Sequence, residues 1–254
     1  MAVNGESLTF WDHLEELRRS IFRVLAVFVC LTVCLFFFKN FLFDKVVLAP
    51  ASSDFFLYRM LGVDFSLNLV NLEVSAQFLI HMKVTFICSL ILCVPYLIYE
   101  IWRFILPALY DNEKKSIRGA FAFASVLFYI GLAAAYCVIF PFMLNFFASY
   151  QVSPDVPNNF SLSSYISMFT STMLAFGLVF EFPAVIAALS SLGVVSREVL
   201  KQYRKHAFVV ILVLSAVITP SGDPFTMMVV CLPLYLLYEV SIMICRNKVE
   251  QPEE

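Results

Sequence analysis

Two adjacent carboxylates, Glu15 and Glu16, lie in the stretch WDHLEELRRSIF (residues 11–22), directly before a long apolar run. If this stretch is helical, Glu15 can reach Arg18 and Arg19 about one turn later, and Glu16 can reach Arg19. Exposed pairs of this kind contribute about 0.3–0.5 kcal/mol to stability. Local pairing is therefore the simpler interpretation. The alternative is that a carboxylate at this position binds a charged group from outside the helix.

Two further carboxylates, Glu113 and Glu181, stand where an acid has physical consequences. Glu113 lies in LPALYDNEKKSIR (residues 106–118), at the expected start of the third long helix, where a carboxylate suits the positive end of the helix dipole. Glu181 lies inside the apolar stretch GLVFEFPAV (residues 177–185), two residues before Pro183. A charge at that depth costs about 2.5–3.5 kcal/mol on insertion scales. Glu181 is thus either an intramembrane polar site or a structural hydrogen-bond partner for backbone that Pro183 leaves free.

The composition indicates that these charges belong to a membrane protein. The 254 residues are 61% hydrophobic and 14% charged, with a mean hydropathy of +0.86, whereas a typical soluble domain is about 45–50% apolar and about 25% charged. The apolar stretches are long and continuous, which favours helices over the alternating strands of a barrel. We predict an all-α integral membrane protein with residues 1–254 in one membrane domain. The net charge of -2 gives no indication of nucleic-acid binding.

Six apolar segments could cross the bilayer, whose hydrocarbon core of about 30 Å takes about 20 helical residues. Pro95, Pro141, Pro183 and Pro233 fall inside four of these segments, and each proline removes a backbone bond and bends its helix. The fifth segment is too short for a comfortable span, so one shallow side of the bundle could thin the bilayer. Bent, unequal helices predict a concave bundle. The expected spans are 20–38, 74–106, 117–149, 165–190, 206–219 and 225–244.

Lysine and arginine residues set the predicted orientation, because they concentrate in the cytoplasmic connections of membrane proteins. The outer side holds only Lys39, Lys45 and Arg59, and Lys83 lies inside the second span. Both termini are therefore predicted to be cytoplasmic, which an even number of spans allows. The basic residues assigned to the cytoplasmic side are Arg18, Arg19, Arg23, Arg103, Lys114, Lys115, Arg118, Arg197, Lys201, Arg204, Lys205, Arg246 and Lys248.

Two local structures are also expected around the second span. Residues 39–73, on the outer side, contain apolar runs and predict short amphipathic helices that lie on the outer surface. Near the inner end of the second span, Glu100 and Arg103 are spaced as an i, i+3 pair, which predicts a local structural ion pair.

Patterns typical of enzymes and metal sites are missing from the sequence. The seven cysteines all lie in apolar segments, without C-x-x-C spacing or a nearby histidine, so neither a disulfide framework nor a metal site is expected. No H-E-x-x-H, G-x-S-x-G or Walker motif occurs, and seven glycines leave little room for a phosphate-binding loop. We expect neither catalysis nor a cofactor. An ion- or proton-coupled solute transporter using Glu181 is an alternative, although the internal repeats of many such transporters are not evident.

Seven short motifs cover most of the chain in a fixed order, and the most specific are FILPALY-x-x-E and AFG-x-x-FE-x-P. They are HLEELRRS (13–20), LAP (48–50), FILPALYDNEKK (104–115), FYIGLAAAYCVIFP (128–141), AFGLVFEFP (175–183), ITPSGDPF (218–225) and LPLYLLYE (232–239). In these motifs the chain resembles the TatC family, the polytopic core of the twin-arginine protein translocase.

The resemblance implies six transmembrane helices in a cupped shape, with both termini cytoplasmic, in the bacterial inner membrane. It implies that Glu16 and Glu113 recognise the twin-arginine motif of signal peptides on folded cargo. Glu15 falls where the family varies, and the resemblance gives it no role. Glu181 matches the intramembrane glutamate of the family, whose implied role is to hold polar interactions within the concave face.

The resemblance also implies a multimeric complex that exports cargo with the proton-motive force. The region around Thr219 and the sixth span is where the family contacts the single-span partners TatA and TatB. This chain departs from the family pattern there. Its turn PSGDP (residues 220–224) carries an extra residue, and Met227 occupies a place that is often polar.

Overall fold

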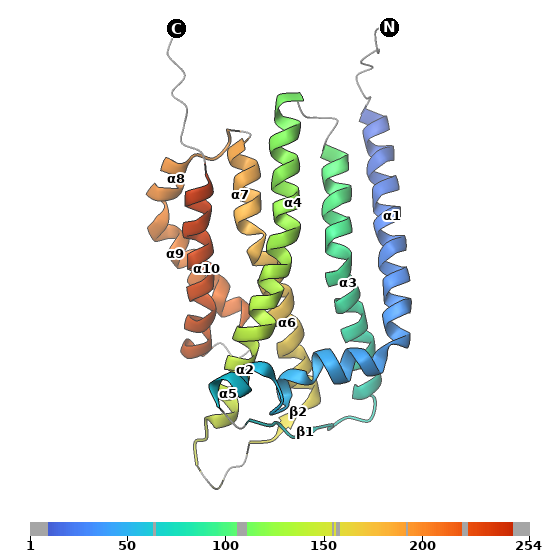
Figure 1. Ribbon diagram of the computed structural model, residues 1–254, viewed down its shortest axis with the longest axis vertical. Helices are drawn as coiled ribbons and strands as arrows, with labels where there is room; N and C mark the ends of the chain where they lie inside the picture. The colour runs from blue at the N-terminus through green and yellow to red at the C-terminus, as the bar shows by residue number, and fades with distance from the viewer. Residues whose placement is uncertain are drawn as a thin grey trace.

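The computed structural model describes residues 10–62, 65–105, 111–153, 155, 158–191, 193–219 and 223–245, and at 10, 12, 61, 105, 111–118 and 120 it describes the backbone alone. Long helices run side by side through most of this part of the chain (Figure 1). The elements are α1 (Phe10–Phe37), η1 (Phe41–Val47), η2 (Ala49–Ala51), α2 (Phe56–Leu61), β1 (Leu69–Val70), α3 (Ala76–Ile105), α4 (Asp111–Ala134), η4 (Ala135–Ile139), α5 (Phe140–Ser149), β2 (Phe160–Ser161), α6 (Leu162–Phe180), α7 (Phe182–Ser191), α8 (Arg197–Gln202), α9 (Arg204–Ile218) and α10 (Pro224–Ile244).

All six predicted spans are helical, and the all-α membrane fold is confirmed. Within the described residues, five helical stretches are long and apolar enough to cross a membrane: His13–Phe37, Ala76–Phe104, Phe121–Ser149, Leu162–Ser191 and Pro224–Ile244. The remaining predicted span is α9, which has 15 residues. At 1.5 Å per residue it is about 22 Å long, shorter than a hydrocarbon core of roughly 30 Å. The fifth span is therefore short, as its sequence predicts.

Two of the four intramembrane prolines lie just after a change of helix type or a helix break, and the other two lie inside continuous helices. Pro95 and Pro233 lie inside α3 and α10. Pro141 is the second residue of α5, directly after η4, a π-helical stretch that separates α4 from α5, and Pro183 is the second residue of α7, after the break between α6 and α7. Because proline has no N–H to donate, the preceding turn loses a hydrogen bond at each position. The predicted bends in the third and fourth spans are confirmed as changes of helix type or direction.

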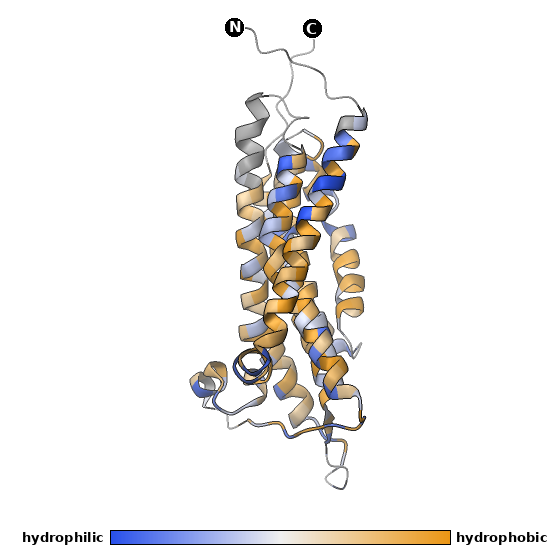
Figure 2. Cartoon of the chain, turned by 90° about the vertical axis from the view of Figure 1, so that its right-hand side faces the viewer, coloured by the Kyte–Doolittle hydropathy of each residue, from blue (hydrophilic) through white to orange (hydrophobic). Residues whose placement is uncertain are grey.

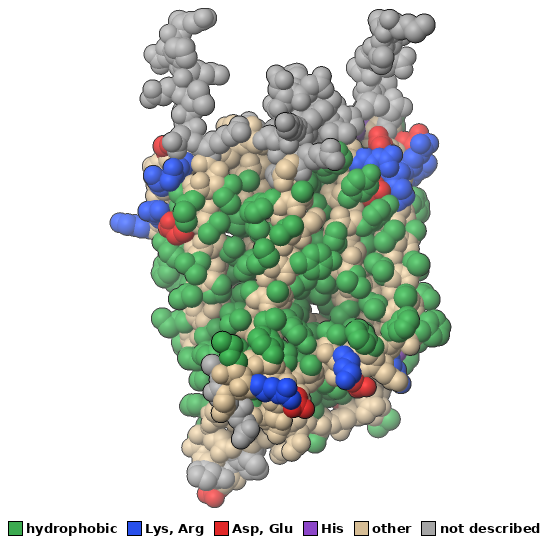
Figure 3. Space-filling view, viewed as in Figure 1, with side chains coloured by type: hydrophobic (Ala, Val, Ile, Leu, Met, Phe, Trp, Pro, Cys, Tyr) green, Lys and Arg blue, Asp and Glu red, His purple; other side chains and the backbone are tan. Residues whose placement is uncertain are grey.

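The charge distribution agrees with the predicted orientation. Helix α1 begins and α10 ends at the same end of the bundle (Figure 1). The hydrophilic residues of α1 gather at that end, and the rest of the helix is apolar (Figure 2). Hydrophobic side chains form a broad band between the charged residues at the two ends of the molecule (Figure 3). We therefore refer to the end with the start of α1 as the cytoplasmic end.

A small cap closes the opposite end of the bundle, where η1, η2, α2 and the strands lie (Figure 1). The strands β1 and β2 are parallel, with Leu69 opposite Phe160. Three tyrosines join the cap to the helices: Tyr58 Oη donates to the carbonyls of Pro50 and Pro141, Tyr136 Oη to that of Val46, and Tyr165 Oη to that of Val47. The predicted short helices of residues 39–73 are confirmed, and these hydrogen bonds hold them against the bundle.

Helices α4 and α6 approach each other closely at two glycines. A Cβ atom on Gly131 would lie 2.6 Å from Cγ of Phe180 and 2.7 Å from the backbone oxygen of Phe176, and a Cβ on Gly177 would lie 2.7 Å from Cε2 of Phe128. In lipid, helix association depends on such close van der Waals contact, because the surrounding tails are as apolar as the side chains. These glycines therefore allow the tight packing of the central helices.

The close contact at Gly131 predicts a stability loss for a single added methyl group. We expect Gly131→Ala to lower the free energy of unfolding by about 1–3 kcal/mol, the usual cost of overpacking. Equilibrium unfolding in detergent, followed by circular dichroism, measures the change. Gly119→Ala is the matched control, since Gly119 lies in the same helix with nothing near its added Cβ, and it should be stabilising by up to about 1 kcal/mol. Equal effects of the two substitutions would contradict the close α4–α6 contact.

Candidate functional site

The two adjacent carboxylates at the start of α1 have different surroundings. Glu15 is exposed, and its Oε1 accepts a hydrogen bond from Nη2 of Arg19 at 2.7 Å and lies 3.9 Å from Nη2 of Arg18. The predicted local pairing is therefore confirmed for Glu15. Glu16 is half-buried and makes no hydrogen bond or ion pair with any other described residue. Its possible contact with Arg19 does not form, because that guanidinium faces Glu15.

Glu16 lies on the side of α1 that faces α3. Ser20 and Arg23 follow it at helical spacings of four and seven residues, and both contact α3 or a residue that does. One turn before Glu16, the ring of His13 stacks on Phe104 near the end of α3, with centroids 4.2 Å apart. The beginning of α1 is thus placed against the cytoplasmic end of α3.

Glu113 lies in the first turn of α4, where the sequence predicts an acid at a helix start. Its side chain and the connection 106–110 lie outside the described residues, and so does any contact between Glu113 and Glu16. The start of α1, the end of α3 and the start of α4 all lie at the cytoplasmic end (Figure 1). The two carboxylate positions therefore share one end of the bundle.

An ion pair between α1 and α3 is the polar contact that sequence reasoning missed. Nε of Arg23 donates to Oε1 of Glu100 at 2.9 Å, and Nη2 of Arg23 donates to Oε2 at 2.8 Å. Nη2 also donates to the hydroxyl of Ser20 at 2.9 Å, and the hydroxyl of Tyr96 donates to Oε1 of Glu100 at 2.9 Å. Glu100 is only 2% exposed. Both of its oxygens are therefore satisfied in a bidentate pair.

The predicted pair of Glu100 with Arg103 is wrong. Spacing along one helix favours that pair, but the side chain of Glu100 points to α1 instead. A signal for the true pair exists in the sequence, because Arg23 and Glu100 lie a few residues inside the cytoplasmic ends of the first two predicted spans. Charges inside membrane spans usually pair with one another at similar depth.

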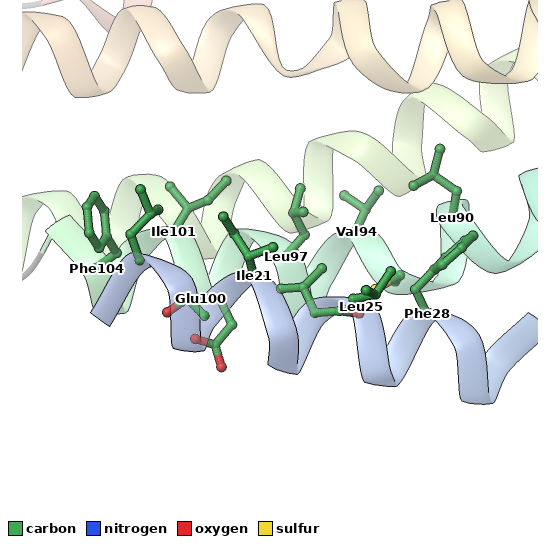
Figure 4. Close-up of a pocket in the computed structure, with 13 residues that line it drawn as sticks. Ile21, Leu25, Phe28, Leu90, Val94, Leu97, Glu100, Ile101 and Phe104 are labelled. Carbon is green, nitrogen blue, oxygen red and sulfur yellow. Dashed lines mark hydrogen bonds between the residues drawn. The ribbon is translucent and has the colours of Figure 1, made fainter. Parts of the chain in front are cut away.

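An apolar cavity of about 350 Å³ lies between α1 and α3, directly beside this ion pair. Leu17 lines it from α1. Ile21 and Leu25 do so too, and Leu97 and Phe104 are among the α3 residues that face them (Figure 4). The cavity starts at the residue after Glu16. The cavity therefore runs from the position of Glu16 into the apolar layer.

Glu181 lies at the break between α6 and α7 and lines a second cavity of about 340 Å³. Its Oε1 atom is buried and has no hydrogen-bond partner among the described residues. The hydrogen bond to backbone freed by Pro183, one of the two interpretations of this residue, does not form at that atom. The remaining lining residues are apolar, and Val94, Leu97 and Ile101 of α3 line both cavities. The two hollows are neighbours, in agreement with the predicted concave bundle.

Thr219 directly follows α9 as its C-cap residue and is 4% exposed. Its hydroxyl donates to the carbonyl of Ser215 at 2.9 Å, one turn earlier in the same helix. The predicted turn PSGDP lies mostly outside the described residues, and Asp223 begins α10 by accepting a hydrogen bond from the backbone N–H of Thr226 at 2.8 Å. Thr219 therefore points into its own chain, and contact with a partner at this residue stays a prediction.

The described residues contain no group of three or more His, Cys, Asp or Glu side chains that could hold a metal ion. The described side chains of the site are therefore carboxylates, the guanidinium groups that pair with some of them, and apolar walls. Such a set can bind cations and apolar segments.

Comparison with known proteins identifies a consistent set of relatives. Residues 12–233 match the family described as Sec-independent protein translocase protein (TatC). A Sec-independent protein translocase protein TatC from Blattabacterium sp. subsp. Periplaneta americana (strain BPLAN) is 37% identical over 259 residues, covering 96% of this chain and 97% of that protein. The protein of the same name from Escherichia coli (strain K12) is 33% identical over 239 residues, covering 92% of this chain and 86% of the relative.

Solved structures agree with the sequence relatives. A crystal structure of the twin arginine translocase receptor TatC in DDM superposes with a TM-score of 0.77 at 29% sequence identity, covering 93% of this chain and 100% of that chain. A second crystal structure of this receptor gives a TM-score of 0.74 at 30% identity, with coverage of 91% and 97%. The helical arrangement and the chain order are thus shared with these proteins.

The unpaired oxygen of Glu181 predicts that this carboxylate lowers stability. We expect Glu181→Leu to raise the free energy of unfolding by about 1–3 kcal/mol, the usual cost of a buried polar group without a partner. Equilibrium unfolding in detergent measures the change. The matched control is Glu100→Leu, which leaves Arg23 without its carboxylate and should lower stability. A loss of stability in Glu181→Leu would show that Glu181 has a stabilising partner.

Proposed function

Because the chain belongs to the TatC family of Sec-independent protein translocase proteins, we propose that it is the receptor subunit of a twin-arginine translocase. In this role it binds signal peptides that carry two consecutive arginines, at the cytoplasmic face of a bacterial inner membrane. Its solved relatives are twin arginine translocase receptors, which supports the proposal. The family is a translocase component and not an enzyme family, and no relative favours the solute-transporter alternative.

The chemistry of arginine recognition suits carboxylates at Glu16 and Glu113. A guanidinium presents its N–H groups in a planar fork that matches the two oxygens of a carboxylate. The ammonium of lysine cannot reproduce this bidentate geometry. Two carboxylates at one end of the bundle would therefore accept two arginines and discriminate against two lysines.

The observation that carries the assignment is the different pairing of Glu15 and Glu16. Glu15 is already paired with Arg19, so its charge is compensated within α1. Glu16 is half-buried on the side facing α3 and has no ion pair with the other described residues. A carboxylate held in this way remains available to a guanidinium from another chain.

The surroundings of Glu16 also suit the apolar part of a signal peptide. Secretory signals place an apolar segment after their basic region. The cavity of about 350 Å³ begins next to Glu16 and continues along α1 and α3 toward the middle of the apolar layer. A peptide whose arginines meet the carboxylates could therefore lay its apolar segment against this cavity, within the concave face.

We further propose that single-span subunits of the TatA and TatB type dock near α9 and α10, in a multimeric complex. Helix α9 is too short to span a full hydrocarbon core, and its Val209, Val210, Val213 and Val217 are between 58% and 77% exposed. A neighbouring helix would cover this apolar face at the thin side of the bundle. Thr219, directly after α9, lies in the region where the family resemblance implies this contact.

The carboxylate assignment predicts a specific loss of peptide affinity. We expect Glu16→Gln and Glu113→Gln each to weaken binding of a twin-arginine peptide by about ten- to a hundredfold, because a hydrogen bond to a charged group contributes about 1.5–3 kcal/mol. Fluorescence anisotropy with the purified chain in lipid nanodiscs measures the dissociation constants.

Two controls make this measurement specific. Glu15→Gln should bind the peptide like the wild type, since Glu15 is occupied by Arg19. A peptide with two lysines should bind weakly to the wild type and should be insensitive to the substitutions. Full affinity in both Glu16→Gln and Glu113→Gln would remove these residues from the binding site.

A further inference from the structure

Among the five long apolar spans of the described residues, helix α1 is the least enclosed. Only 6% of its apolar window is buried, against 28% for α3 and 44% for the α6–α7 span. Among the described elements it packs chiefly against α3. Its position therefore depends on contacts with one neighbouring helix.

Apolar packing alone does not fix the register between α1 and α3. The cavity of about 350 Å³ lies between the two helices, so Ile21 and Leu25 of α1 border free space on one side (Figure 4). In lipid, apolar side chains gain little by exchanging lipid tails for another helix. A seam with such a hollow tolerates sliding or rotation of α1 unless a directional contact prevents it.

The ion pair of Arg23 with Glu100 is that directional contact. Two parallel hydrogen bonds of 2.9 and 2.8 Å hold the guanidinium and the carboxylate in one plane. Ser20 and Tyr96 add a third and a fourth hydrogen bond from the two helices. Either charge left unpaired inside the membrane would be costly. One arrangement of the two helices therefore satisfies all four groups.

We propose that Arg23 and Glu100 are positioning residues, which set the register of α1 against α3 and so hold Glu16 in place for the signal peptide. Glu16 lies seven residues before Arg23, about 10 Å along the same helix and on the same face. Glu100 lies five residues before the end of α3, from which the chain leads to Glu113 in α4. The ion pair thus joins α1, which carries Glu16, to α3, which precedes the helix that carries Glu113.

The inference rests on the proposed function, and its experiment separates the two. The variants are Arg23→Gln, Glu100→Gln and the charge swap Arg23→Glu/Glu100→Arg, each in the full chain in lipid nanodiscs. The first readout is the affinity for a twin-arginine peptide, with the two-lysine peptide as reference. The second readout needs no peptide: it is the distance distribution between spin labels on noncanonical residues at Glu15 in α1 and Gly119 in α4. Both label sites are exposed, and Gly119 has open space for a side chain.

We expect each single substitution to weaken peptide binding at least tenfold and to broaden or shift the label distances. The charge swap should restore a narrow distribution and recover most of the affinity, because it recreates an ion pair between the same positions. If a single variant fails to accumulate in the membrane, the charge-swap variant alone tests the inference. A folded charge-swap variant with wild-type label distances is then required to bind the peptide.

Three results would overturn the inference. The first is wild-type affinity in both single variants. The second is a loss of affinity with unchanged label distances, which would mean that Arg23 or Glu100 touches the peptide directly. The third is a swap with wild-type distances and no binding. If instead the wild type does not distinguish the twin-arginine peptide from the two-lysine peptide, the proposed function fails, and the label distances still test whether the pair sets the register.

Discussion

The absence of water in the bilayer core is the constraint on which this bundle depends. A helix in hydrocarbon gains little from apolar contact with another helix, so association depends on close packing and on hydrogen bonds. At the centre, Gly131 and Gly177 bring α4 and α6 into direct contact. At the outer end, three tyrosine hydroxyls bind carbonyls of the cap or its neighbouring helix. Together with the packing of α7 against α4 and α10, these contacts give a well-packed half of the molecule made of α4, α6, α7 and α10.

The other half, α1 and α3, is built differently. Its main polar contact is the bidentate pair of Arg23 with Glu100, and a cavity replaces part of the apolar packing beside it. The two cavities share residues of α3, so this helix separates them. One cavity is lined by Glu100, whose oxygens are both hydrogen-bonded, and the other by Glu181, which has an oxygen without a partner among the described residues. The well-packed half thus supports, on the side of α1 and α3, a surface with an apolar cavity and two carboxylates beside it. A receptor for an incoming apolar peptide needs such a surface.

Much of the fold could be predicted from the sequence because the membrane imposes simple rules. Span length, the distribution of lysine and arginine, and the prolines gave the six helices, their orientation and their interruptions. Glu100 shows where such reasoning fails. Its spacing to Arg103 favours a pair along one helix, whereas its actual partner, Arg23, lies 77 residues away on another helix. Periodicity identifies which face of a helix is apolar, but it does not identify the neighbour that this face meets.

The distinction between Glu15 and Glu16 shows the same limit at the candidate site. From spacing alone, both residues have an arginine within one turn, and only the family resemblance separated them. The structure adds a physical reason, because one of the two carboxylates is neutralised by Arg19 and the other lies on the face that also carries Ser20 and Arg23. Adjacent residues on a helix are rotated by about 100° from each other. That rotation places one acid at the surface and the other beside α3, about two turns before the ion pair that joins the two helices.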